Sequence, residues 1–172
     1  MNNQLKRILF HLILITVTGV LGFGVSFAKD KTGKTAKKDM GGWEIDSPYN
    51  RLYNANDMER IKGYIKSFKE VVPMPGMSPG VAFVLHEKFD DEDILVHLCP
   101  AWYMDINKTG LKKGDEVKIR GAWIEIGDKD AFVASKIKRG ENFTLKVRLT
   151  QDGKPFWTMD PYELAKEKAA TD

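Results

Sequence analysis

An apolar period of two residues runs through most of the chain and limits the folds that it can form. From Ile61 onward, apolar residues alternate with polar ones, as Val81, Phe83 and Leu85 illustrate. Side chains of a strand point alternately to opposite faces, so this period predicts half-buried strands, whereas a surface helix needs a period near 3.6. The predicted strands cover residues 61–66, 81–85, 94–98, 117–126, 132–137 and 143–149.

Five to six strands without a long intervening helix indicate an all-β protein. We predict a small five- to six-stranded barrel of the OB (oligonucleotide/oligosaccharide-binding) type, because closure removes the unpaired strand edges that invite aggregation. Gly63 and Gly121 interrupt otherwise regular strands and fit the bends of a small barrel. An open sandwich is the alternative.

Two short helices are predicted to flank the strands. Ser47 before Pro48 and Asp160 before Pro161 combine a capping side chain with a proline at the first helical position. The first helix is expected to pack its aromatic and apolar neighbours on the outside of the main body. These neighbours are Trp43, Tyr49, Leu52 and Tyr53.

The first 28 residues have the pattern of an export signal. Lys6 and Arg7 precede an apolar stretch, and Ser26-Phe27-Ala28 is followed at once by charged residues. We predict a signal peptide cleaved after Ala28, and hence a periplasmic or secreted protein that touches the membrane only transiently, through this segment. An uncleaved inner-membrane anchor is the alternative, since about 18 apolar residues suffice to cross a bilayer.

Composition divides the remainder into three parts. Residues 29–42 are lysine-rich and predict a flexible linker, with contact to anionic lipid as the alternative. Residues 43–159 form the predicted barrel domain, and residues 160–172 a short C-terminal helix or tail. Without residues 1–28 the chain has 25 basic and 24 acidic side chains, a charge of +1. This near neutrality argues against nucleic acid as a partner.

Five segments carry a family resemblance: SPYNRLY at 47–53, PMPGMS at 73–78, VHLCPAWY at 96–103, KGD at 113–115 and DGKPFW at 152–157. In this order they resemble small secreted bacterial OB-fold-like proteins, largely uncharacterised. The resemblance implies the barrel and says almost nothing of function. This chain has Cys99 where the family pattern has glycine, and cysteine is strained there if the glycine serves a positive φ angle.

His86, His97 and Cys99 are the candidate metal ligands. His97 and Cys99 lie two apart on a predicted strand and therefore share a face. A closed zinc site needs four ligands, and the sequence supplies no second pair at a suitable spacing. A packed histidine beside a buried cysteine is favoured, so we predict no metal and no cofactor. As the lone cysteine, Cys99 forms no internal disulfide and is either buried or a free thiol.

Residues 97–103 combine imidazole, thiol and aromatic groups at the end of a predicted strand. Large aromatic side chains bind ligands at low cost in entropy, so this segment predicts a ligand-binding lip. Burial of Trp102 as a plug of the barrel is the alternative. The predicted contact residues are His97, Trp102, Tyr103, Arg148 and Trp157.

A second candidate surface is basic. Lys118, Arg120, Lys146 and Arg148 share an outward parity on strands predicted to be neighbours. Such a patch could bind a polyanion, whereas ordinary solvated strand faces look similar and are favoured.

No catalytic motif is recognisable: the carboxylates of residues 90–93 form a turn of like charges rather than an acid–base pair in an apolar setting. The sequence therefore predicts an exported, non-catalytic OB-fold binding or accessory module whose ligand is a protein, a peptide or a small anion. One alternative is a periplasmic factor that handles metal or haem. The other is a structural subunit of a cell-envelope complex. The oligomeric state stays open.

Overall fold

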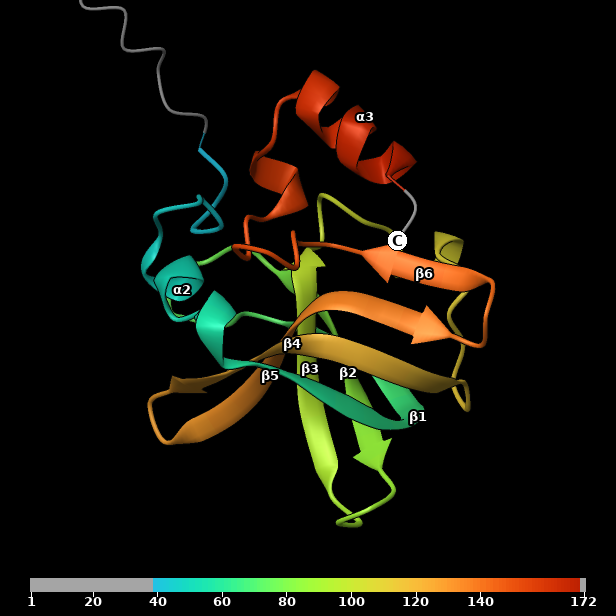
Figure 1. Ribbon diagram of the computed structural model, residues 1–172. Helices are drawn as coiled ribbons and strands as arrows, with labels where there is room; N and C mark the ends of the chain where they lie inside the picture. The colour runs from blue at the N-terminus through green and yellow to red at the C-terminus, as the bar shows by residue number, and fades with distance from the viewer. Residues whose placement is uncertain (1–38, 171–172) are drawn as a thin grey trace, which may run out of the picture. The chain divides into compact units, whose positions relative to one another are not determined.

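The computed structural model describes residues 39–170, so the predicted signal peptide and most of the predicted linker lie outside the described residues. Six strands form one sheet in this part of the chain (Figure 1). The strands are β1 (Met58–Val71), β2 (Gly80–Glu87), β3 (Asp93–Pro100), β4 (Glu116–Ile126), β5 (Lys129–Arg139) and β6 (Phe143–Lys146). The helices are α2 (Pro48–Arg51), α3 (Pro161–Ala169) and the 3-10 turns η1 (Ala55–Asp57), η2 (Ile106–Lys108) and η3 (Phe156–Thr158).

The first five strands close into a ring. β1 pairs antiparallel with both β2 and β4, while β2 continues to β3 and β4 continues to β5. A short parallel pairing of β3 with β5, Val96 with Phe132 and His97 with Val133, closes the ring. β6 pairs with β5 further along the chain. This strand order confirms the predicted all-β class with five to six strands, closed into a ring, and it excludes the open sandwich.

Apolar side chains from every strand of the ring fill its interior. Phe83, Leu98 and Phe132 have no exposed surface, and Ile65 and Ile119 are 1% exposed. Burying side chains of this size stabilises the fold by about 1.5–3 kcal/mol each relative to leaving them in water. The apolar residues of the predicted alternation are therefore the ones whose burial stabilises the ring.

Two glycines permit the close approach of neighbouring strands. A Cβ at Gly63 would lie 2.2 Å from the carbonyl oxygen of His86, and one at Gly121 would lie 2.1 Å from that of Val133. A register shift follows Gly63 on β1, and another occurs beside Gly121 in the pairing of β4 with β5. The prediction of a bend is therefore confirmed at Gly121, whereas Gly63 lies in regular pairing two residues before the irregularity on β1.

The short helices begin where their caps predict. The Ser47 hydroxyl accepts a hydrogen bond from the Asn50 amide at 3.2 Å, and Asp160 accepts one from the Glu163 amide at 2.8 Å. Both capping side chains satisfy an amide that the first turn of a helix leaves without an internal partner.

The predicted placement of the first aromatic residues on the outside of the main body is wrong. Trp43 is fully buried and Tyr49 is 2% exposed, and both belong to the main core. The Trp43 indole donates a hydrogen bond to the Ser78 carbonyl at 2.9 Å. Its ring also occupies the space of a side chain at Gly80, where an added Cβ would lie 2.4 Å from it. The segment before α2 therefore supplies core to the ring.

Candidate functional site

The five predicted contact residues converge on one cluster of ring systems. Tyr103 lies between Trp102 and Trp157, with ring centroids 6.4 and 5.9 Å away. Trp157 packs edge-on against Trp43 at 5.8 Å, and its indole donates to the Trp43 carbonyl at 2.8 Å. Trp43 contacts Tyr49 at 5.0 Å, and Tyr49 contacts His97 at 6.0 Å. Segments far apart in the sequence thus form a continuous aromatic cluster.

Only the outer end of this cluster reaches solvent. Trp102 is 48% exposed and Tyr103 is half-buried, whereas His97 and Trp157 are 4% and 6% exposed. The alternative in which Trp102 plugs the barrel does not fit this exposure. Trp102 and Tyr103 are thus the members of the cluster whose side chains reach solvent, and the buried rings pack behind them.

Arg148 lies beneath this cluster and is only 1% exposed. Its guanidinium packs between the rings of Trp157 and Tyr53, 4.8 and 5.0 Å from their centroids. It donates to the Asn50 side-chain oxygen at 2.7 Å and to the Gly153 carbonyl at 3.3 Å. No carboxylate among residues 39–170 forms an ion pair with it, and burial lowers its pKa. Neutral acceptors and aromatic faces therefore replace the usual counter-ion.

The predicted outward orientation of Arg148 is wrong, and a hydrogen-bond irregularity explains why. The amides of Val147 and Arg148 both donate to the carbonyl of Ser135, at 2.9 and 3.2 Å. Because one carbonyl accepts from two successive amides, the regular hydrogen-bond register with β5 is lost at this point. The side chains of Val147 and Arg148 are consequently both buried. β6 accordingly ends at Lys146, short of the predicted end at Leu149.

His97 and Cys99 are both buried on β3. The His97 Nδ1 atom lies 3.1 Å from the Tyr49 hydroxyl, and burial lowers the pKa of His97 to about 4. Burial raises the pKa of Cys99 to about 12, although the positive charge of Arg148 acts in the opposite direction. Because of this raised pKa, the thiol stays protonated and inert at neutral pH. The prediction that Cys99 is buried is confirmed, and its φ angle is not positive, so the expected strain is absent.

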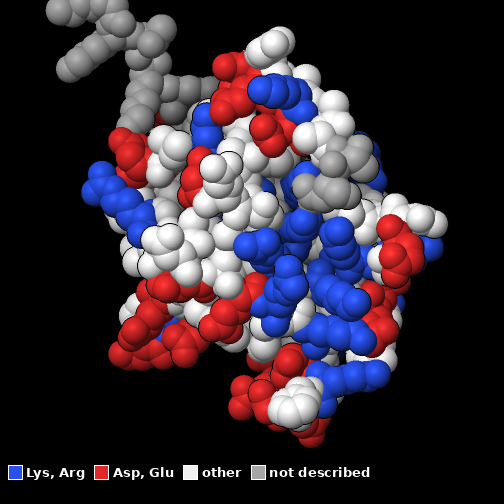
Figure 2. All heavy atoms as spheres, viewed as in Figure 1, with Lys and Arg blue, Asp and Glu red and all other residues white. Residues whose placement is uncertain are grey.

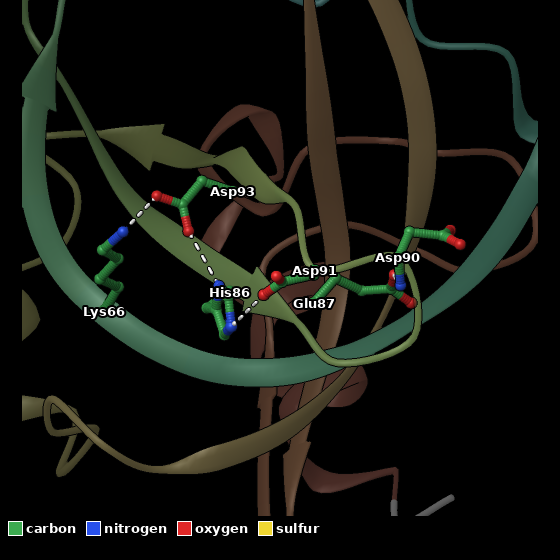
Figure 3. A network of polar contacts seen from close by, with 6 residues as sticks. All are labelled: Lys66, His86, Glu87, Asp90, Asp91 and Asp93. Carbon is green, nitrogen blue, oxygen red and sulfur yellow. Dashed lines mark hydrogen bonds and ion pairs between the residues drawn. The ribbon is translucent and has the colours of Figure 1, made fainter.

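His86 lies apart from His97, in a network of exposed charges at the turn between β2 and β3 (Figure 3). Its Nδ1 atom is 3.1 Å from Asp93 and its Nε2 atom 3.3 Å from Asp91. The ammonium of Lys66 lies 2.5 Å from the other carboxylate oxygen of Asp93. The hydrogen bond from Lys66 and, to a smaller extent, the one with His86 lower the pKa of Asp93. His86 therefore does not join His97 and Cys99. Within the described part of the chain, no group of three or more His, Cys, Asp or Glu side chains could hold a metal ion.

A cleft of about 480 Å³ opens beside His97. Its walls come from the end of β1, from β3 and from the hairpin between β4 and β5. Because β3 and β5 pair at only two positions, they leave a gap on the side of Leu95 and Ala131. The lining residues are Val71, Val72, Pro73, Leu95, His97, Ile126, Asp128, Lys129, Asp130 and Ala131. Apart from His97, sequence reasoning missed this cleft, because its walls meet only through the β3–β5 pairing.

A grid of cations covers four adjacent strands, and we call it the cation ladder. Lys62, Lys118 and Lys138 face one another across β1, β4 and β5. Figure 2 shows a continuous field of basic side chains on one face of the molecule, with acidic ones gathered toward its margins. A second row of the ladder crosses β1, β4, β5 and β6 through Arg60, Arg120, Lys136 and Lys146.

Only part of this ladder was predictable from the sequence. Lys118, Arg120 and Lys146 were in the predicted patch, but β5 separates β4 from β6, so the predicted neighbourhood of those two strands is wrong. Lys136 and Lys138 fill the intervening strand, and β1 contributes Arg60 and Lys62 on the other side. The alternation of each strand could have indicated these residues, but the strand order could not be read from the sequence.

Within residues 39–170, no helix is long and apolar enough to span a membrane.

The fold and these surfaces define a small β protein whose strands close into a ring, with an aromatic cluster, a cleft and a basic face. The sequence model of the MamS/MamX magnetosome protein family matches residues 57–144, about half of the chain, and the chain belongs to this family. The match covers β1 to β5 and the first residues of β6.

None of the curated protein sequences matches this chain. Among solved structures, it is similar to a mitochondrial single-stranded DNA-binding protein from S. cerevisiae, with 14% sequence identity and a TM-score of 0.37. That similarity covers 49% of this chain and 96% of the other. A similarity of this size says nothing about the ligand of this chain.

Proposed function

We propose that this protein is an exported, non-catalytic accessory module of the magnetosome that binds an extended segment of a partner protein. The family supports the setting, and the cleft beside His97 supports the binding mode. Binding by addition of a strand requires an open strand edge next to pockets for alternate side chains. The cleft offers both.

The open edges are the observation that carries this proposal. Between Asp93 and Leu95, β3 pairs only with β2, and between Lys129 and Ala131, β5 pairs only with β4. The backbone on the cleft side of both segments is therefore open to a third strand. Val72, Leu95 and Ala131 provide apolar walls. The rim carries two carboxylates, Asp128 and Asp130, against the single ammonium of Lys129, and this excess of negative charge favours a segment that carries basic residues.

The predicted contact residues take different roles in this proposal. His97 lines the cleft itself. Val71, Gly80 and Pro100 are register neighbours across β1, β2 and β3, so the loop that carries Trp102 and Tyr103 leaves the sheet at the same end as Val72. These aromatic side chains would extend the binding surface beyond the cleft. The buried Arg148 and Trp157 would hold Tyr103 in position.

Binding of a basic, extended peptide tests the cleft. We expect a peptide selected from a random library to lose about tenfold or more in affinity when Val72→Asp places a charge on the apolar wall. Val72 is 56% exposed, so its replacement should leave the fold intact.

Trp102→Ala is expected to weaken binding of the same peptide with little change in the thermal midpoint of unfolding. Fluorescence anisotropy gives the affinities, and calorimetry the midpoints.

Phe89→Asp is the matched control, because Phe89 is 92% exposed and lies in the turn between β2 and β3. Equal losses in the Phe89 and Val72 variants would remove the cleft as the binding site. Chemical-shift changes at Leu95 and His97 on adding the peptide would support it.

Export makes a separate prediction about the N-terminus. When the full chain is expressed in a bacterium with an envelope, we expect the accumulated protein to begin at Lys29, because signal peptidase cleaves after small residues such as Ala28. Intact mass spectrometry of the periplasmic fraction measures this. Ala28→Leu should block cleavage. A full-length protein in the membrane fraction would instead establish the anchor.

A further inference from the structure

The cation ladder is more basic than the composition of the domain explains. Residues 39–170 contain 20 basic and 22 acidic side chains, so this part of the chain is slightly acidic. Seven of the basic side chains nevertheless occupy one face, in two rows that cross adjacent strands. Adjacent strands are about 4.8 Å apart, and like charges placed directly opposite each other destabilise a sheet. The fold alone gives no reason to gather them.

Within residues 39–170, the ion pairs lie at the margin of the ladder and not at its centre. Lys62 forms an ion pair with Glu116 at 3.0 Å, at the margin of the ladder, and Lys146 donates to the Ala170 carbonyl at 3.2 Å. Among the described residues, no carboxylate lies within ion-pair distance of the central cations. These central cations are Arg60, Lys118, Arg120 and Lys138.

The central cations also surround a hollow. It has a volume of about 230 Å³ and is lined by Arg60, Lys118, Ile119, Arg120, Lys136 and Lys138. Among the described residues that line the hollow, Ile119 is the one apolar member and none is aromatic. The guanidinium of an arginine can donate two parallel hydrogen bonds to one phosphate group, and lysines add point charges around it. A hollow of this kind suits a compact group of several negative charges.

We propose that the cation ladder binds a ligand with several closely spaced phosphate groups. The absence of an aromatic side chain from the hollow disfavours single-stranded nucleic acid, since stacking of bases on aromatic rings supplies much of that affinity. The phosphates could belong to a soluble oligophosphate or to the headgroups of a membrane. This surface is distinct from the cleft proposed to bind a protein segment.

Titration calorimetry with tripolyphosphate tests the proposal on the purified full chain. We expect binding that weakens as salt is raised, because exposed charges are screened. The double variant Lys118→Gln, Lys138→Gln should lose about tenfold or more in affinity. Its thermal midpoint should not fall, because removing opposed like charges relieves repulsion. The control Lys69→Gln, Lys113→Gln removes the same charge from exposed positions outside the ladder and should change the affinity less than about twofold.

Vesicles distinguish the two sources of phosphate. The chain and both double variants are sedimented with phosphatidylcholine vesicles that contain or lack phosphatidylglycerol. All three proteins share the same N-terminus, so a difference between them cannot come from that segment. If only the ladder variant loses binding to the phosphatidylglycerol vesicles, the phosphates belong to headgroups. If the ladder variant loses tripolyphosphate binding but sediments with the vesicles as before, the phosphates belong to a soluble ligand. The proposal is overturned if neither probe binds, if the control loses as much as the ladder variant, or if single-stranded DNA of equal charge binds more tightly than tripolyphosphate. Val72→Asp should leave this binding unchanged, which separates it from the peptide site.

Discussion

Replacing Arg148 with alanine is expected to lower the free energy of unfolding by about 4 kcal/mol, the loss typical of removing a large, fully buried side chain. The change leaves a cavity between the rings of Tyr53 and Trp157, which now contact the guanidinium. It also leaves the Asn50 side-chain oxygen and the Gly153 carbonyl without their donor. Urea unfolding, followed by tryptophan fluorescence, measures the difference.

Two further variants separate the shape of Arg148 from its charge. Arg148→Met fills most of the space without a buried cation, and exchanging a buried charge for an apolar side chain of similar size is often neutral or stabilising. We expect its stability to stay within about 1 kcal/mol of the native protein. Arg148→Lys keeps the charge and loses the planar fork, so it should lose about 2 kcal/mol. A methionine variant as unstable as the alanine variant would show that the guanidinium itself, and not packing, stabilises the core.

The strands were predictable because their signal is local. A period of two residues depends on the sheet's own geometry, so residues such as Val81, Phe83 and Leu85 identify β2 without knowledge of its neighbours. The closure of the sheet was also predictable, because short strands with few covering helices have few other ways to protect their edges. The caps at Ser47 and Asp160 were predictable for the same reason: each involves a side chain and an amide three residues later.

Features that depend on tertiary register were not predictable. Arg148 keeps the outward parity of its strand in the sequence, and only the shared acceptor at Ser135 turns it inward. Trp43 and Tyr49 precede the first strand by several residues, and no periodicity there indicates that they enter the core. The cation ladder needs the order β1, β4, β5, β6, because only that order brings Arg60 and Lys136 onto one face.

The candidate site was found in part because residue type was informative. Trp102 and Tyr103 were selected as a dense aromatic pair at the end of a strand, and the structure places them at the solvent end of the aromatic cluster. Trp157 and His97 join the same cluster but are buried. Their chemistry was visible in the sequence, while their depth depends on which segments cover them.

Acidification is expected to destabilise the protein by about 3 kcal/mol through His97 alone. Burial lowers the pKa of His97 to about 4, whereas an exposed histidine in the unfolded chain has a pKa near 6.5. Between these values the unfolded chain binds a proton that the folded chain does not, so the free energy of unfolding falls as pH falls. The contribution of neutral His97 is complete above about pH 6.5 and lost below about pH 4.

His97→Gln isolates this contribution from the other groups that titrate in the same range. Carboxylates with a lowered pKa, such as those of Asp93 and Glu116, also reduce stability in acid, but they are present in both proteins and cancel in the difference. We therefore expect the native protein to lose about 3 kcal/mol more than the variant between pH 7 and pH 4. Urea unfolding at half-unit pH steps measures this, with His86→Gln as the exposed control. A parallel decline in the native protein and in His97→Gln would show that His97 takes up its proton without opening the core, and that its ring reaches water from the cleft.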